Sequence, residues 1–474
     1  MTGKSLLSVF LVSLALASCS MAPDYVRPPA PVAQQWPAVS AAGVQPSAES
    51  AGQLPATAVG WRSMFRSPKL QLLIESALEN NRDLRIATLN IEAARNTYRI
   101  QRSELIPSIS ASGSFTRQRL SESTSGTGQP ETSSAFSAGL GATAYELDLF
   151  GRIRSESSGG FNRYLATEEG RRAAQITLVA EVANAYLAYL ADTELLQLTE
   201  QTLRTRQDSS DLIKRSFELG ARSRLDMVQA ASLVESARAS LARYQRQAGL
   251  DRNALTLLVG KEIEPELLKP ESLSSVSVME TLPAGVPSSV LLDRPDVRQA
   301  EFLLKAENAN IGAARAAFFP IISLTGSAGF ASSSLSGLFS SGPNGIWSFI
   351  PQITLPIFQG ERLMANLRLA KTKRDIAVAQ YEKAVQTAFR EVSDALVARA
   401  TYTGQLKAQQ ELKRATETAC AITKARYDHG IDSYFVLLDA QRSLYEAQQN
   451  EILVRQENLV NLIDLYKVLG GGWQ

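Results

Sequence analysis

Residues 427–443 have the sequence Tyr427-Asp-His-Gly-Ile-Asp-Ser-Tyr-Phe-Val-Leu-Leu-Asp-Ala-Gln-Arg-Ser443, and the rest of the chain is organised around them. A long helical pattern ends at Gly430, and glycine is the usual residue just past a helix end because it tolerates a left-handed backbone. A new helical pattern begins after Asp432 and Ser433, which are preferred capping residues. The stretch therefore predicts the turn at the tip of a helical hairpin.

A second copy of this turn lies 210 residues earlier, where Gly220 corresponds to Gly430 and Ser223 to Ser433. Ser223 and Asp226 also have the spacing of a capping box. An internal duplication of about 210 residues therefore covers nearly all of the chain that has a regular pattern. Further corresponding positions are Leu258-Val-Gly260 with Val468-Leu-Gly470, and Pro107, Ser110 and Gly113 with Pro320, Ser323 and Gly326.

The hydrophobic period changes from helical to alternating at Pro107. Two predicted strands surround a polar loop at 121–134, and two more surround a Ser- and Gly-rich loop at 331–345. Small polar residues alternate with apolar ones and charge is almost absent, which favours an outer-membrane barrel hairpin over a soluble hairpin. The apolar series of the first hairpin is Ile109, Ala111, Gly113 and Phe115, then Phe136, Ala138, Leu140, Ala142 and Ala144.

Four strands cannot close a barrel, and open sheet edges are not tolerated in lipid. Several chains must therefore share one barrel. Two chains would give eight strands with a filled interior, whereas three would give twelve strands with room for a lumen. The four long helical segments of each chain, with mixed polar and apolar faces, likewise suit a wall better than a solid core.

The composition excludes several function classes. The net charge is +2, which gives no indication of nucleic acid or of an acidic substrate. Two cysteines and one histidine cannot supply a disulfide framework and nearly exclude a metal site, so we expect no cofactor. The single histidine, His429, lies at the turn with no Ser or Cys motif beside it, so we expect no enzyme activity.

The N-terminus has the pattern of a secretory signal. Lys4 precedes an apolar segment at 6–17, and the segment ends in Leu16-Ala17-Ser18-Cys19. This ending resembles a bacterial lipobox, which implies that Cys19 is acylated and becomes the first mature residue. The alternative is an ordinary cleaved signal peptide with a cysteine at this position by chance.

Several blocks together resemble the outer-membrane factors of tripartite efflux pumps, the TolC/OprM family, and most closely its lipid-anchored branch. The resemblance covers roughly residues 16–473. The blocks are Tyr145-Glu-Leu-Asp-Leu-Phe-Gly-Arg152, Leu355-Pro-Ile-Phe358, Arg294-Pro-Asp-Val297, Asn310-Ile-Gly-Ala-Ala314 and Leu438-Asp-Ala-Gln-Arg-Ser443.

The resemblance implies a homotrimer with a twelve-stranded β-barrel in the outer membrane, a twelve-helix barrel in the periplasm and a mixed equatorial domain. It implies a periplasmic adaptor and an inner-membrane resistance-nodulation-division transporter as partners, in contact with outer-membrane lipid. The expected segments are a signal peptide (1–18), a lipid-anchored tail (19–66), two helices (67–105 and 291–318), two barrel hairpins (106–150 and 319–358), two long helical hairpins (151–260 and 359–469), an equatorial linker (261–290) and a C-terminal tail (470–474).

The resemblance also places a gate at the helix tips. By position, Asp439 matches an acidic ring that narrows the channel, and Phe435, one turn earlier, matches an apolar ring. The alternatives are that Asp439 is an ordinary aspartate on a helix surface and that Phe435 packs between helices. Three Asp439 carboxylates around one axis would attract cations. The exposed turns around Gly220 and Gly430, with Ser223 and Ser433, are the expected docking sites for the adaptor.

The predicted lock of the gate is a link between Tyr427 and Asp226 of neighbouring hairpins. The chain departs from the family pattern at Asp432, where some relatives carry arginine, so the lock must differ in detail. We expect Arg442 to take the place of that arginine as the partner of a carboxylate.

Two other functions remain open at this point. The same fold serves as a duct for metal-ion efflux or protein secretion, and the pore-lining candidates do not separate these from drug efflux. A lipid-anchored periplasmic adaptor would share the helical hairpin. It would carry lipoyl-like β-modules instead of paired ten-residue strands, so we expect an efflux duct.

Overall fold

The computed structural model describes residues 20–33, 36, 60–126, 128–279, 288–340 and 344–471. The signal peptide and Cys19 predicted above lie outside these residues. The chain divides into two compact units, and helices α4, α5, α7 and α8 contribute residues to both. The first unit comprises Met1–Pro29, Asn90–Glu168 and Gln299–Glu382, and the second comprises Ala30–Leu89, Glu169–Arg298 and Lys383–Gln474.

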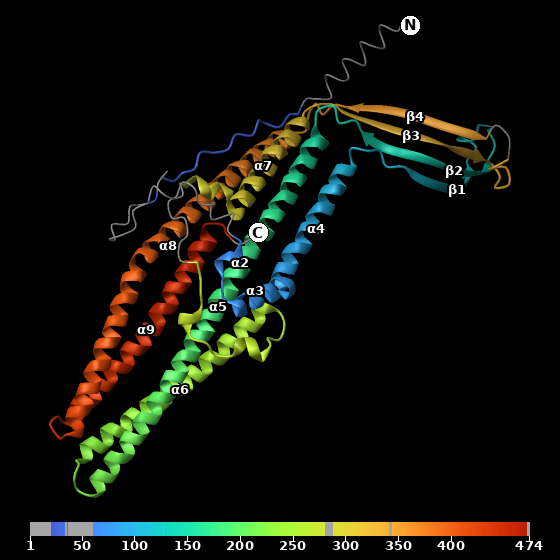
Figure 1. The fold of residues 1–474 in the computed structure, drawn as a ribbon. Coiled ribbons are helices and arrows are strands. Elements are labelled where there is room, and N and C mark those ends of the chain that lie inside the picture. The colour runs from blue at the N-terminus through green and yellow to red at the C-terminus, as the bar shows by residue number, and fades with distance from the viewer. Residues whose placement is uncertain are drawn as a thin grey trace. The chain divides into compact units, whose positions relative to one another are not determined.

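The first unit contains one antiparallel sheet of four strands in the order β1-β2-β3-β4, as the alternating pattern predicted. Figure 1 shows the sheet with β1 and β4 at its edges. Both edges lack a partner strand within the described part of the chain, so a membrane-embedded sheet needs neighbouring chains to close it. The strands are β1 (Ser110–Leu120), β2 (Glu131–Glu146), β3 (Ile321–Ser332) and β4 (Gly345–Thr354).

The two faces of the sheet differ as predicted. On one face, cross-strand serine pairs join hydroxyl to hydroxyl, Ser114 with Ser137 at 2.7 Å and Ser327 with Ser348 at 2.8 Å. On the other face, the rings of Phe115 and Phe136 stack with centroids 4.5 Å apart. This second face also carries Ala138, Leu140, Ala328, Phe330 and Trp347, which pair across the strands, and we call it the apolar face.

A β-bulge in β2 corrects one part of the prediction. Ala142 pairs with Gly326, but the next pair joins Tyr145 to Leu324, so the predicted alternation through Ala144 is wrong. Ala144 has φ of 52°, which is unusual for a residue with a side chain. The extra residue moves Tyr145 onto the apolar face, where its hydroxyl donates to the carbonyl of Leu105 at 2.9 Å.

The corner after β2 explains one of the sequence blocks. The carboxylate of Asp148 accepts the backbone N–H groups of Ile153 (3.1 Å) and Arg154 (2.8 Å), which satisfies the first turn of α5 (Arg152–Glu218). Arg152 bridges Glu146 at the end of β2 and Glu156 in the helix. These contacts fix the angle between strand and helix.

The tail after Cys19 lies extended along α7 (Pro295–Ala316), and we call residues 20–29 the strap. Arg315 donates to the carbonyl of Met21 at 3.1 Å, and Asn308 donates to that of Pro23 at 2.7 Å. The guanidinium of Arg27 makes two hydrogen bonds to the carboxylate of Glu301, at 3.1 and 2.7 Å. The segment predicted as the tail therefore begins with extended residues that lie on α7.

The duplication is also visible in the second unit. The helix predicted at 67–105 is interrupted at Asn81, between α3 (Pro68–Asn80) and α4 (Arg82–Ser103). The Asn81 amide donates to the carbonyl of Leu258 at 2.9 Å. In the second copy Arg294 donates to the carbonyl of Val468 at 2.6 Å. Each copy therefore uses one polar side chain to hold a carbonyl near the end of its return helix, α6 (Arg224–Val259) or α9 (Tyr434–Val468).

The linker between the copies is irregular, as predicted, and packs on the second unit. Phe65, just after α2 (Trp61–Met64), forms a β-bridge with Val278, and the hydroxyl of Tyr186 donates to Glu271 at 2.7 Å. No helix in the described part of the chain is both long and apolar enough to cross a membrane. The linker helices are η3 (Pro265–Leu268), η4 (Leu273–Ser275) and η5 (Ser288–Asp293), and the remaining long helix is α8 (Arg362–Asp428).

Candidate functional site at the helix tips

Both tips have the same turn geometry, and Figure 1 shows them where α5 meets α6 and where α8 meets α9. Gly220 and Gly430 have φ of 76° and 74°, the left-handed conformation that favours glycine. Two bonds close each turn in the Schellman pattern. They run from Gly220 to Phe217 (2.9 Å), Ala221 to Ser216 (2.8 Å), Gly430 to Tyr427 (2.9 Å) and Ile431 to Arg426 (2.9 Å), each from N–H to carbonyl.

The two caps after the turns differ. Ser223 and Asp226 form the predicted capping box: the backbone N–H of Asp226 donates to Ser223 Oγ at 3.1 Å, and that of Ser223 donates to Asp226 Oδ2 at 3.2 Å. Ser433 occupies the cap position of α9, but its side chain makes no capping bond. The residue three positions after it is Val436, which has no carboxylate to return the bond.

The hairpins of the two copies pack against each other through an apolar cluster, which we call the tip cluster. Its most informative member is Tyr434, which is 3% exposed. Tyr434 was not among the residues predicted from the sequence, although its position seven residues after Tyr427 in a helical hairpin places the two rings on the same side. The buried members of the tip cluster are Ile213, Ala230 and Leu233 of the first hairpin and Tyr434, Leu437 and Leu438 of the second, with Met227 and Tyr427 packed against them.

Tyr427 lies at the edge of the tip cluster. Its ring is 5.7 Å from that of Tyr434, and the guanidinium of Arg222 lies over it at 4.8 Å. Burial raises the pKa of the Tyr427 hydroxyl, while Arg222 lowers it and the charge of Asp226 raises it. The structure thus brings Tyr427 and Asp226 close together, but no hydrogen bond joins them within the described residues. Instead, Asp226 accepts from the hydroxyl of Ser223 at 2.9 Å.

Asp432 has a partner that the sequence analysis did not find. Arg426, at the end of α8, donates Nε to one carboxylate oxygen of Asp432 at 2.7 Å and Nη2 to the other at 3.0 Å. This bidentate pair spans the turn around Gly430, and it holds the pKa of Asp432 below its usual range. Arg442 forms no ion pair with the described residues of its own chain, so it is available to a carboxylate of another chain.

Phe435 and Asp439 lie one turn apart on α9, on the side away from the tip cluster. Phe435 is 61% exposed and Asp439 is exposed, whereas Leu437 and Leu438 between them are buried. The alternative that Phe435 packs between helices does not hold within one chain. The start of α9 therefore exposes a large apolar side chain and a carboxylate together, one turn apart.

Arg206 of α5 contacts α6 and α9 next to the tip cluster, and no pattern in the sequence distinguishes it from other helix arginines. It is 6% exposed, donates to the carbonyl of Leu233 at 3.2 Å and lies 5.1 Å from the ring centroid of Tyr445. The hydroxyl groups of Tyr445 and Thr199 are 2.8 Å apart. Burial lowers the pKa of the Arg206 guanidinium, and Arg442 lowers it further.

Two carboxyl groups face each other between α5 and α6. Gln247 donates to Oδ1 of Asp251 at 3.1 Å, while Oδ2 of Asp251 is buried and accepts no donor among the described residues. Burial is the largest cause that raises the pKa of Asp192 to about 7, and the facing carboxyl group of Asp251 raises it further. The pair therefore holds a proton at neutral pH more readily than an isolated carboxylate.

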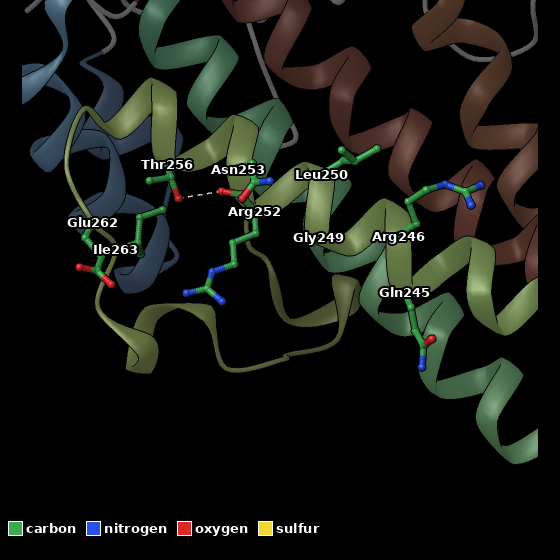
Figure 2. A pocket seen from close by; sticks show the side chains of 9 residues that line it. All are labelled: Gln245, Arg246, Gly249, Leu250, Arg252, Asn253, Thr256, Glu262 and Ile263. Carbon is green, nitrogen blue, oxygen red and sulfur yellow. Dashed lines mark hydrogen bonds between the residues drawn. The ribbon is translucent and has the colours of Figure 1, made fainter.

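A surface pocket of about 530 Å³ lies beside the last turns of α6 and the segment that follows it. Figure 2 shows Thr256 turned back on its own helix, where its hydroxyl donates to the carbonyl of Arg252 at 2.8 Å. The lining side chains are mainly polar. They are Gln245, Arg246, Gly249, Leu250, Arg252, Asn253, Thr256, Glu262 and Ile263.

A four-stranded sheet with two open edges and a duplicated pair of long helical hairpins defines a class of protein: a membrane channel assembled from several chains. Comparisons with known proteins give the family. The outer membrane efflux protein family matches residues 73–261 and 286–471. The chain belongs to this family.

The chain is 50% identical over 470 residues to the probable efflux pump outer membrane protein TtgC of Pseudomonas putida, which covers 99% of this chain and 96% of that protein. A crystal structure of a membrane protein from Pseudomonas aeruginosa matches with a TM-score of 0.89 at 43% identity, covering 96% of this chain and 98% of the other. The open state of the Neisseria gonorrhoeae MtrE outer membrane channel matches with a TM-score of 0.86 at 40% identity, covering 96% and 99%.

The predicted fold is confirmed by these neighbours. Three chains build a twelve-stranded barrel in the outer membrane, continuous with a twelve-helix barrel and a mixed equatorial domain. The protein is an outer-membrane efflux channel, and its family consists of transport proteins. Channels of this class work with an adaptor and an inner-membrane transporter.

Proposed function

We propose that this chain is the exit duct of a tripartite resistance-nodulation-division multidrug pump and that its gate lies at the helix tips. The proposal of a gate rests on the burial pattern of the first residues of α9. Tyr434, Leu437 and Leu438 are buried on one side, and Phe435 and Asp439 are exposed on the other. The similarity to TtgC supports the efflux pathway.

In a trimer with threefold symmetry, the exposed residues of α9 repeat three times around the axis and form two rings. Three copies of Phe435 form an apolar constriction, and three copies of Asp439 form an acidic one a turn away. The acidic ring attracts cations and repels anions, because carboxylates around one axis add their potentials. The apolar ring narrows the path and excludes water when the tips are together.

The closed gate is held by weak contacts at its rim. Arg222 of the first turn lies over the ring of Tyr427 at the end of α8, whereas the pair of Arg426 and Asp432 stays within the second turn. Exposed contacts of this kind are worth little individually, so a partner that binds the tips can replace them. Asp226 and Arg442 supply further links to the neighbouring hairpin.

The adaptor docks at the turns. Two large apolar side chains flank the turn glycines, Leu219 at 85% exposed and Ile431 at 63% exposed. Exposed apolar side chains at the far end of a hairpin are suited to bind a partner.

A complementation experiment tests both the pathway and the docking surface. Deletion of the gene should raise susceptibility to several unrelated drugs, and the wild-type gene should restore resistance. Leu219→Asp with Ile431→Asp should fail to restore resistance while trimers still assemble. The matched control is Leu250→Asp with Leu257→Asp, which places the same two charges on exposed leucines (53% and 79%) away from the tips. Full resistance with the tip variant would place the docking site elsewhere.

We also propose that Cys19 carries a covalent lipid anchor. The strap supports this, because Arg315 holds Met21 near the end of α7, shortly before β3 begins at Ile321. An acyl chain two residues before Met21 would therefore lie near the start of the barrel strands.

Radioactive palmitate should label the wild-type protein and not Cys19→Ser. If the serine variant is labelled equally, another residue carries the lipid. A Cys420→Ser variant is the matched control, because Cys420 is the other cysteine of the chain and should not affect labelling.

A further inference from the structure

The outer end of β1 carries a charge pattern that the channel function does not use. Arg117 and Arg119 follow Phe115 at alternate positions, so all three side chains lie on the apolar face. Their partners across the strand pair are Ser134 and Thr132, which are uncharged. The acidic residue at this end of β2, Glu131, pairs with Leu120 and lies on the opposite face.

Both arginines are exposed and make no ion pair with the described residues. Two guanidinium groups and two hydroxyl groups therefore point outward from the apolar face, about 7 and 13 Å along the strand from the Phe115–Phe136 stack. In a barrel the apolar face meets lipid. Because β1 leaves α4 on the helical, periplasmic side, its far end meets the outer leaflet.

The same face is hollowed beyond the aromatic stack. A depression of about 900 Å³ is bordered by Gly113, Leu140, Phe330 and Trp347, and by Phe339 of the loop after β3. Phe339 packs edge to face on Phe330, with centroids 6.0 Å apart. The depression is lined mainly by apolar side chains, so it suits a hydrocarbon chain.

We propose that the outward face of β1–β3 binds a phosphorylated, multiply acylated glycolipid of the outer leaflet, of the lipid A type. Arg117 and Arg119 bind its phosphates, and the depression holds one of its acyl chains. Arginine suits this role because its planar fork binds phosphate oxygens in pairs. The glycolipid is favoured over a glycerophospholipid because it presents two phosphates to two arginines and belongs to the leaflet at this end of β1.

The test is native mass spectrometry of the purified trimer titrated with bisphosphorylated, hexa-acylated lipid A. Wild type should retain up to three lipids, one for each chain. Arg117→Gln with Arg119→Gln should weaken binding about tenfold or more, because the variant loses both charge-assisted contacts to phosphate. The control, Arg82→Gln with Arg85→Gln, removes the same charge from exposed positions on α4 and should bind as wild type does.

Two further experiments test the acyl-chain depression and the preference for the lipid A headgroup separately. Gly113→Leu fills the depression and fits, because a Cβ there lies 3.8 Å from its nearest neighbour, the carbonyl oxygen of Ser137. It should weaken binding several-fold while trimer assembly and conductance stay unchanged. Phosphatidylglycerol should bind more weakly than lipid A. The proposal is overturned if the double arginine variant binds lipid A as wild type does, or if phosphatidylglycerol binds equally well.

Discussion

At the scale of single residues, the tip shows which side chains a helical pattern can locate. Gly220, Gly430 and Ser223 are predictable because a positive φ and a capping box each demand particular residue types. The pair of Arg426 and Asp432 was not predictable, because it joins residues on either side of a turn whose exact path sets their distance. Arg206 was missed for the same reason, since its partners come from two other helices.

The carboxyl pair of Asp192 and Asp251, between α5 and α6, should make the stability of the folded protein depend on pH. The folded protein raises the pKa of Asp192 to about 7, above the value in the unfolded chain. Its contribution to stability is therefore fully present in acid and is lost as the pH rises through neutrality. Thermal stability of the trimer should fall between about pH 5 and about pH 8, and Asp192→Asn should reduce that dependence. The control is Asp211→Asn at an exposed position, and an equal pH dependence in all three proteins would contradict the assignment.

At the scale of elements, periodicity predicted the four strands and both long hairpins. Alternation also predicted which face of the sheet is apolar. It failed at Ala144, because a bulge depends on one residue adopting a positive φ that its side chain does not favour. Tyr434 illustrates a different limit: an aromatic residue in a helical hairpin can face the tip cluster or the lumen, and only packing decides.

The buried Arg294 should matter more to stability than the exposed Arg82 at the start of α4. The Arg294 side chain is 8% exposed and bonds Asp296, Glu391 and the carbonyl of Val468. Arg294→Met should destabilise the helical part by about 2–3 kcal/mol, because it removes several charge-assisted bonds from a buried site. Arg82→Met, at an exposed position next to the repeat counterpart Asn81, should change stability by less than about 0.5 kcal/mol. Urea unfolding followed by circular dichroism measures both, and equal effects would show that the bonds of Arg294 are not needed.

At the scale of the whole molecule, one duplication accounts for the assembly. Each copy supplies one strand pair and one long hairpin, and the strand pairs join through β2 and β3 into a sheet with two open edges. Closure of those edges by other chains is what makes the protein a channel. The copies have also diverged: Leu225 and Gln229 stand in the first hairpin where Phe435 and Asp439 stand in the second.

This divergence allows the gate to be tested with an internal control. Single-channel conductance of the purified trimer in a planar bilayer should rise several-fold in Phe435→Ala with Asp439→Ala, because the variant removes both rings. Leu225→Ala with Gln229→Ala makes the corresponding change in the first hairpin and should leave the conductance near that of wild type. If the Phe435 and Asp439 variant conducts as wild type does, the constriction of this channel lies elsewhere.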